Sequence, residues 1–115
     1  MTLWGTGTPK REFLHVDDMA SACVFVMNKT GFKDIVNIGS GEEVSIRELG
    51  ELICEVVGFH GDIIFDRDKP DGTPRKLLDT SRLNELGWKA QIKLKEGLQQ
   101  TYQWFLKSYC KAEIA

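Results

Sequence analysis

The stretch that decides the fold class is residues 35–58, IVNIGSGEEVSIRELGELICEVVG. It opens on residues 35–38, three of which are β-branched and apolar, which predicts a strand, and continues through a glycine-rich turn. Ser45 and Glu48 then form a capping box, in which the serine side chain bonds the N3 amide and the glutamate reaches back. Apolar residues follow at helical spacing as far as Gly58, a typical helix terminator. Strand, turn and helix in this order predict an α/β domain.

The same alternation continues on both sides of this stretch. Upstream, residues 2–5 and 11–16 are predicted strands, and Asp17 or Asp18 caps a helix that runs to about Asn28. Downstream we expect a strand at 62–66 and an extended segment at 75–78. A short helix should follow, capped by Asp79 or Thr80 and ending at Gly87. The last helix should run over 94–109, with a weak start because Lys93 is a poor capping residue. The faces predicted to point inward are Met19, Ala22, Cys23, Val26 and Met27 on the first helix, and Leu94, Leu98, Tyr102, Phe105 and Leu106 on the last.

Length and charge limit the class of protein. The chain has 115 residues, enough for one domain (1–110, with 111–115 as a tail), and a net charge of −2, which argues against a dedicated nucleic-acid binder. No apolar run approaches the roughly 18 residues that span a bilayer, and the N-terminus lacks the pattern of a signal peptide, so we expect a cytoplasmic protein. The three cysteines form no C-x-x-C pair, and Cys23 and Cys54 are predicted to be buried hydrophobes.

The sequence offers no complete cofactor, catalytic or metal motif. Gly5-x-Gly7 and Gly39-x-Gly41 each lack the third glycine of a dinucleotide fingerprint, so plain turns are the favoured interpretation. Neither tyrosine is followed by a lysine four positions later. His15, which precedes two aspartates, could be a base or a metal ligand, but we favour a histidine that packs at the entrance of a helix.

Two polar loops are candidates for a ligand site. Residues 4–11, WGTGTPKR, place an aromatic ring and two cations around a turn, and residues 66–76, DRDKPDGTPRK, end on two adjacent cations. Arginine forks phosphate, lysine acts as a point charge and a tryptophan face can stack on a base or sugar. Together the loops could hold a nucleotide diphosphate sugar. The alternative is that both are solvated, charged turns.

The same residues also carry a resemblance to a known family. Residues 4–20, WGTGTPKREFLHVDDMA, and above all residues 69–79, KPDGTPRKLLD, resemble segments of the GDP-L-fucose synthases, which are extended short-chain dehydrogenases of the NAD-dependent epimerase/dehydratase family. Further matches in the same order are Asn37-Ile38-Gly39-Ser40-Gly41, Ser45-Ile46-Arg47-Glu48-Leu49, Leu86-Gly87-Trp88 and Thr101-Tyr102-Gln103-Trp104-Phe105-Leu106.

The resemblance implies a function and a set of site residues. Enzymes of this family are NADP-dependent 3,5-epimerases and 4-reductases that convert GDP-4-keto-6-deoxymannose to GDP-L-fucose. Their N-terminal Rossmann domain carries the cofactor site and the Tyr-x-x-x-Lys pair, neither of which matches this sequence. The chain is therefore expected to be a small mixed α/β domain equivalent to the C-terminal substrate domain, with no catalytic or cofactor residues and no activity alone. By resemblance Trp4 and Arg11 contact a GDP-sugar, Lys76 contacts phosphate and Asp71 contacts substrate.

The resemblance also predicts how the chain associates. In extended dehydrogenases the segments matching 17–28 and 35–38 lie against the Rossmann sheet, so here Val24, Phe25, Val26, Met27 and Ile38 would leave apolar surface and an open strand edge. We therefore expect a homodimer or another oligomer. Two alternatives stay open: a free-standing oligomeric protein from a truncated or mobile gene fragment that binds no sugar, and a fragment that completes a Rossmann half supplied in trans.

Overall fold

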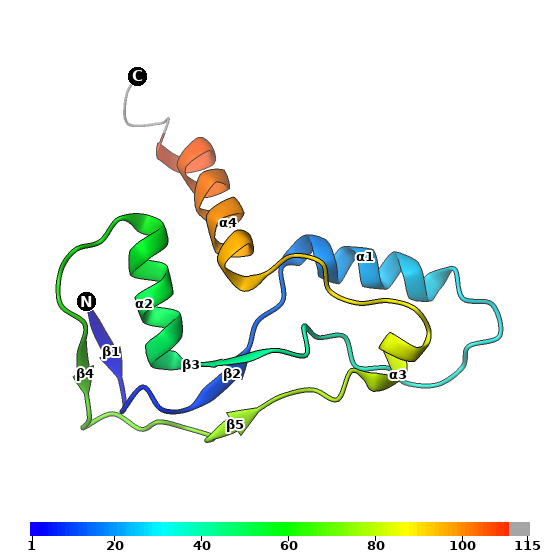
Figure 1. Cartoon of the computed structure of the whole chain (residues 1–115), viewed down its shortest axis with the longest axis horizontal. Coiled ribbons are helices and arrows are strands. Elements are labelled where there is room, and N and C mark those ends of the chain that lie inside the picture. Colours follow the sequence, from blue (N-terminus) through cyan, green and yellow to red (C-terminus); the bar gives the residue numbers. More distant parts are fainter. Residues whose placement is uncertain (111–115) are drawn as a thin grey trace.

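The molecule is a flat plate with extents of 52 × 42 × 18 Å. A computed structural model describes residues 1–110, and Figure 1 views the plate down its shortest axis. The Cα radius of gyration is 17.3 Å, whereas a compact domain of this length has about 13 Å. The helices and strands therefore form little more than one layer.

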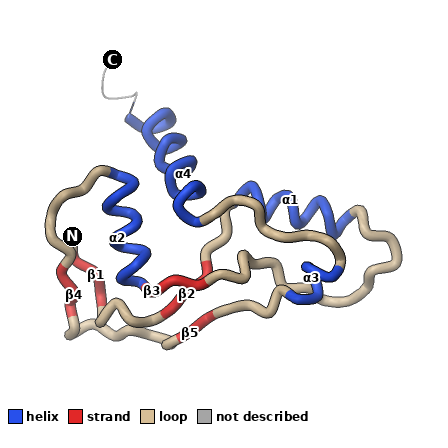
Figure 2. Tube along the Cα trace, viewed as in Figure 1, coloured by secondary structure: helices blue, strands red, loops and turns tan. Residues whose placement is uncertain are grey.

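The element order confirms a small mixed α/β fold. The strands are β1 (Thr2–Trp4), β2 (Lys10–Glu12), β3 (Glu43–Ser45), β4 (Ile64–Asp66) and β5 (Arg75–Lys76), and the helices are α1 (Val16–Met27), α2 (Ile46–Val57), α3 (Ser81–Glu85) and α4 (Leu94–Tyr109). Strands β1 and β4 pair in parallel. The other sheet has the order β3-β2-β5, with β3 antiparallel and β5 parallel to β2. Long loops join these short strands (Figure 2).

Helix α2 is the element that the sequence predicted most closely. The capping box is present in both directions, and Gly58 ends the helix at φ 72° in the left-handed region. Two further amides of the first turn bond carbonyls of the 5–9 segment: Ile46 N donates to Pro9 O and Arg47 N to Gly7 O, both at 2.9 Å. Helix α4 packs against α2 and has the predicted bounds, and its N-cap Lys93 makes no side-chain capping bond, as expected.

Two predicted strands are corrected by the structure. Residues 35–38 form no strand, because no segment within residues 1–110 pairs with them; Ile35 O instead accepts from Arg82 Nη1 at 2.6 Å. The predicted strand 11–16 ends at Glu12, since its partner strands β3 and β5 are only three and two residues long. The expected open strand edge is therefore wrong.

The start of α1 also differs from the prediction. His15 is the N-cap, and its Nδ1 accepts from Asp17 N at 3.2 Å, so neither aspartate caps the helix. Asp18 is buried and its Oδ2 accepts from the backbone amides of Gln91 and Ile92 at 3.0 and 2.8 Å. The carboxylate thus ties α1 to the loop before α4.

The core is small and lies between α1, α3 and the loop that follows α3. Ala22, Leu83 and Trp88 are its buried members, and Trp88 Nε1 donates to Ser21 Oγ at 3.2 Å. Cys54 is buried as predicted, but Cys23 is exposed. Met19, Met27 and Phe105, which we expected to point inward, are exposed as well. Among residues 1–110, no other helix or strand covers these side chains of α1 and α4.

Candidate functional site

The β2–β5 pairing brings two of the predicted site residues together. Its register places Arg11 opposite Lys76 and Lys10 opposite Arg75. Successive side chains in a strand alternate between faces, and partners in neighbouring strands about 4.8 Å apart share a face. Arg11 and Lys76 therefore lie side by side on one face of the sheet, and Lys10 and Arg75 lie on the other.

The two cations of the second face are neutralised within the chain. Glu43 of β3 accepts from Arg75 Nε at 2.8 Å and lies 3.8 Å from Lys10 Nζ. The Arg75 guanidinium, with a smaller contribution from Lys10, lowers the pKa of Glu43, and Glu43 in turn raises the pKa of Arg75. This face holds its own counter-ion.

The Arg11–Lys76 face has no such counter-ion. Within residues 1–110 neither side chain takes part in an ion pair. Arg11 Nη1 donates to the Lys10 carbonyl at 2.7 Å, which leaves the rest of its guanidinium fork available. Two adjacent cations without a carboxylate repel each other and favour a bound anion, and arginine suits phosphate in particular.

Asp71 is held by the turn that precedes β2. Its Oδ1 accepts from Thr6 N at 2.6 Å and its Oδ2 from Thr6 Oγ1 at 2.8 Å. These two bonds, the backbone amide first, lower the pKa of Asp71. The carboxylate predicted to contact substrate is thus already engaged with Thr6, a residue that the sequence analysis did not single out.

Trp4 lies directly before that turn and is 68% exposed. Lys69 Nζ stands 5.5 Å from the centroid of its indole ring, a cation–π distance. In the sequence Lys69 is only one cation of a charged loop. The pairing of β1 with β4, which the sequence does not specify, brings the 66–69 turn beside Trp4.

Both glycine turns are occupied by carboxylates of the chain itself. Gly41 N donates to Glu12 Oε2 at 2.6 Å, in the way that Thr6 N donates to Asp71. The first amides of α2 are bonded to the 5–9 segment and to Ser45. The amides of Thr6 and Gly41 are therefore already bonded to carboxylates of the chain, one in each glycine turn.

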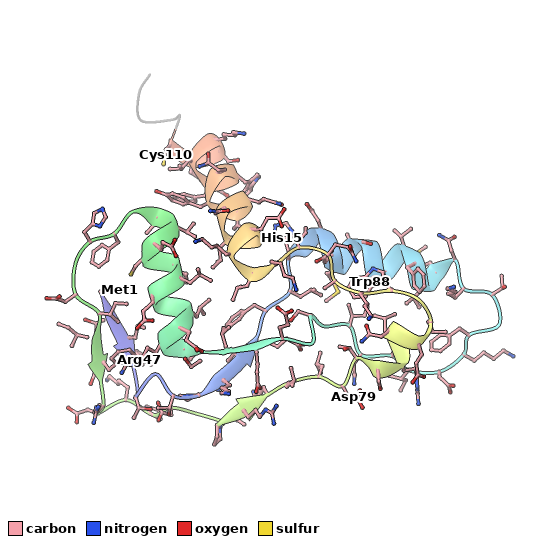
Figure 3. The ribbon with its side chains drawn as sticks, in the orientation of Figure 1. Met1, His15, Arg47, Asp79, Trp88 and Cys110 are labelled. Atoms are coloured by element: carbon pink, nitrogen blue, oxygen red, sulfur yellow. The ribbon has the colours of Figure 1, made fainter. Side chains whose placement is uncertain are left out.

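His15 packs where the sequence placed it, at the entrance of a helix. His15 lies at the start of α1 (Figure 3). Its side chain is 10% exposed and lies against Gly97 of α4, where an added Cβ would stand 3.1 Å from His15 Cδ2. His15 also lines an apolar pocket of about 250 Å³ between the 13–15 segment, α2 and α4, whose other walls are mainly leucine and isoleucine side chains. Residues 1–110 hold no cluster of three or more potential metal ligands, and no helix among them is long and apolar enough to cross a membrane.

Comparisons with known proteins agree with this fold and these motifs. The model of the NAD dependent epimerase/dehydratase family matches residues 1–39. GDP-L-fucose synthase 1 of Arabidopsis thaliana is 58% identical over 96% of this chain and 34% of its own length, and GDP-L-fucose synthase of Escherichia coli is 50% identical over 94% and 36%. A crystal structure of a GDP-L-fucose synthetase from Naegleria fowleri bound to NADP superposes with a TM-score of 0.87 at 27% identity, over 94% of this chain and 35% of that one.

The described fold matches part of the extended short-chain dehydrogenase fold, about a third of the solved neighbour. The chain is similar to proteins named GDP-L-fucose synthase at 50–58% identity, so the resemblance seen in the sequence is confirmed. The chain spans about a third of the length of the curated relatives it matches.

Proposed function

We propose that this chain is the nucleotide-sugar-binding portion, residues 1–110, of a GDP-L-fucose synthase-like enzyme, and that its ligand is a GDP-sugar. Arg11 and Lys76 bind the diphosphate, and the exposed ring of Trp4 lies along the nucleotide or the sugar. The observation that carries the proposal is the adjacent Arg11–Lys76 pair, which has no counter-ion within the described residues. The relatives named GDP-L-fucose synthase supply the class of ligand.

The same proposal makes the chain inert by itself. Hydride transfer needs a bound nicotinamide, which relatives of this kind bind as NADP, and proton transfer needs a positioned acid or base. Both glycine turns are filled by carboxylates, and His15 Nδ1 accepts from the Asp17 amide. Activity would then require a Rossmann domain, joined to this one or supplied in trans, in the cytoplasm where we place the protein.

Isothermal titration with GDP and GDP-mannose tests the proposal. We expect saturable binding that weakens as salt rises, because exposed charges are screened. Arg11→Ala and Lys76→Ala should each weaken it, whereas Lys89→Ala, which removes an exposed lysine beside Trp88, should not. No heat at millimolar ligand with a folded protein, or equal loss in the Lys89 variant, contradicts the proposal.

A second candidate is a free-standing oligomer without sugar binding. It is favoured by the exposed apolar side chains of α1 and the following loop, among them Met27 at 83% and Ile35 at 85% exposure. Oligomers whose association is unaffected by GDP, combined with no GDP binding, would favour it. The titration above therefore separates the two candidates.

A further inference from the structure

We infer that Asp71 is a positioning residue: its carboxylate fixes the 66–76 loop on the Gly5–Thr8 turn and so holds Lys76 beside Arg11. The inference rests on the proposed anion site and deepens it. It differs from the expectation given by resemblance, in which Asp71 contacts substrate. We call the paired hydrogen bonds between Thr6 and Asp71 the Thr6–Asp71 clamp.

The clamp uses both carboxylate oxygens on one residue. Oδ1 accepts from the Thr6 amide at 2.6 Å and Oδ2 from the Thr6 hydroxyl at 2.8 Å, so the carboxylate is fixed in position and in rotation. Thr6 Oγ1 also lies 2.8 Å from Thr8 Oγ1, which fixes the hydroxyl in turn. A ligand hydroxyl would have to compete with these bonds.

Gly5 is shaped to admit the carboxylate. It has φ 80°, and a Cβ built on it would clash with Asp71 Oδ1. Only glycine both adopts this conformation readily and leaves this space. The conformation of the turn therefore leaves room for the Asp71 carboxylate, although Thr6 and Asp71 are 65 residues apart in the sequence.

The clamp stands next to the two cations. Gly72, the residue after Asp71, lies against the Arg11 guanidinium, where an added Cβ would be 3.7 Å from Nη2. Two residues further, Pro74 O accepts from Lys10 N at 2.9 Å, and this bond begins the pairing of β2 with β5. Asp71 thus fixes the loop immediately before the register that places Lys76 opposite Arg11.

The direction in which removal of Asp71 changes anion binding distinguishes a positioning role from electrostatic repulsion and from direct contact with the ligand. An aspartate that is merely near the cations repels phosphate, so its removal tightens anion binding. An aspartate that accepts a ligand hydroxyl matters for GDP-mannose and not for inorganic pyrophosphate, which has no such hydroxyl. A positioning aspartate is needed for both ligands.

The test is titration of the full chain with inorganic pyrophosphate and with GDP-mannose. We expect Asp71→Ala and Thr6→Val each to weaken both ligands about tenfold or more, the size of one or two lost charge-assisted hydrogen bonds. The double variant should bind no more weakly than either single one. Thr6→Ser keeps the hydroxyl and should bind like the wild type, and Asp71→Asn, which keeps polar atoms at both positions without the charge, should weaken binding less than Asp71→Ala does.

Two outcomes overturn the inference while leaving the anion site intact. One is tighter or unchanged pyrophosphate binding by Asp71→Ala, and the other is full additivity of the Asp71 and Thr6 effects. If the wild type itself binds neither ligand, the proposed function fails, and the ligand-positioning role fails with it. Hydrogen exchange at the Thr6 amide then shows separately whether the clamp exists: protection in the wild type must be lost in Asp71→Ala.

Discussion

The carboxylate of Glu12 lies in the Gly39–Gly41 turn, where its Oε2 accepts a 2.6 Å hydrogen bond from the Gly41 amide. This contact ties the end of β2 to the turn before β3, and Glu12 is half-buried there. Glu12→Ala should lower the free energy of unfolding by about 1–3 kcal/mol, because the amide loses a charged acceptor. Urea denaturation measures this. Glu51→Ala, at an exposed glutamate of α2, should change it far less, and equal losses would contradict the prediction.

Gly39→Ala should destabilise the same turn from the other side. An added Cβ would lie 2.7 Å from both Glu12 carboxylate oxygens, so the side chain must move and lose its bond. In the Glu12→Ala background, Gly39→Ala should lower the free energy of unfolding much less than it does in the wild type, because the Glu12 carboxylate is no longer there to clash with the added Cβ. A double-mutant cycle in urea shows this coupling, and additive effects would exclude it.

The Ser45–Glu48 capping box should stabilise α2. Ser45→Ala removes the acceptor for Glu48 N and should cost about 1 kcal/mol. Ser108→Ala, in the last turn of α4, removes a serine that caps no helix and should be neutral or slightly stabilising. Thermal melts followed by far-UV circular dichroism compare the two variants, and a similar fall in both Tm values would contradict a capping role.

Stability should decline in acid. Hydrogen bonds and ion pairs lower the pKa of four carboxyls below their unfolded values of 3.8–4.5, namely Glu43, Glu48, Asp71 and Asp79. Each group stabilises the fold above its unfolded pKa, and this stabilisation is lost as pH falls through its folded pKa. The urea midpoint should therefore be flat between pH 7 and 5 and fall below about pH 4.5. In Glu43→Gln the urea midpoint should decrease less steeply as pH falls. An unchanged pH dependence of the midpoint would show that the Glu43–Arg75 ion pair contributes nothing to it.

Self-association should run through the exposed apolar face of α1 and the loop after it. Val24, Met27 and Ile35 are 58%, 83% and 85% exposed. Met27→Lys and Ile35→Lys should lower the association constant, and Gln103→Lys on exposed α4 should not. Sedimentation velocity measures this, and a monodisperse wild-type monomer at high micromolar concentration would contradict the prediction.

Local signals in the sequence were sufficient for the helices. The Ser45–Glu48 box and Gly58 define α2 by short-range chemistry, and residues 94–109 form one helix as predicted. The strand prediction at 35–38 failed because a strand depends on a partner that its own residues do not specify. The His15 cap was missed because aspartate is the commoner capping residue.

The candidate site could be foreseen in part. Arg11 and Lys76 were singled out as ligand-binding residues, and the parallel register that joins them only appears in the structure. Thr6 and Glu12 escaped attention because their partners, Asp71 and Gly41, are 65 and 29 residues away. Neither separation follows a helical or strand period, so no pattern in the sequence pointed to these contacts.

The 18 Å thickness of the plate has a calorimetric consequence. A typical globular protein of 115 residues gains about 1.4–1.7 kcal/mol/K of heat capacity on unfolding, mostly from newly hydrated apolar surface. A single layer whose buried apolar cluster is Ala22, Leu83 and Trp88 has little such surface to expose. Its heat-capacity increment should be smaller and its melting endotherm broader than those of a globular domain of equal length. A binding partner that covers the exposed apolar side chains of α1 should narrow the melting endotherm and also move it to higher temperature.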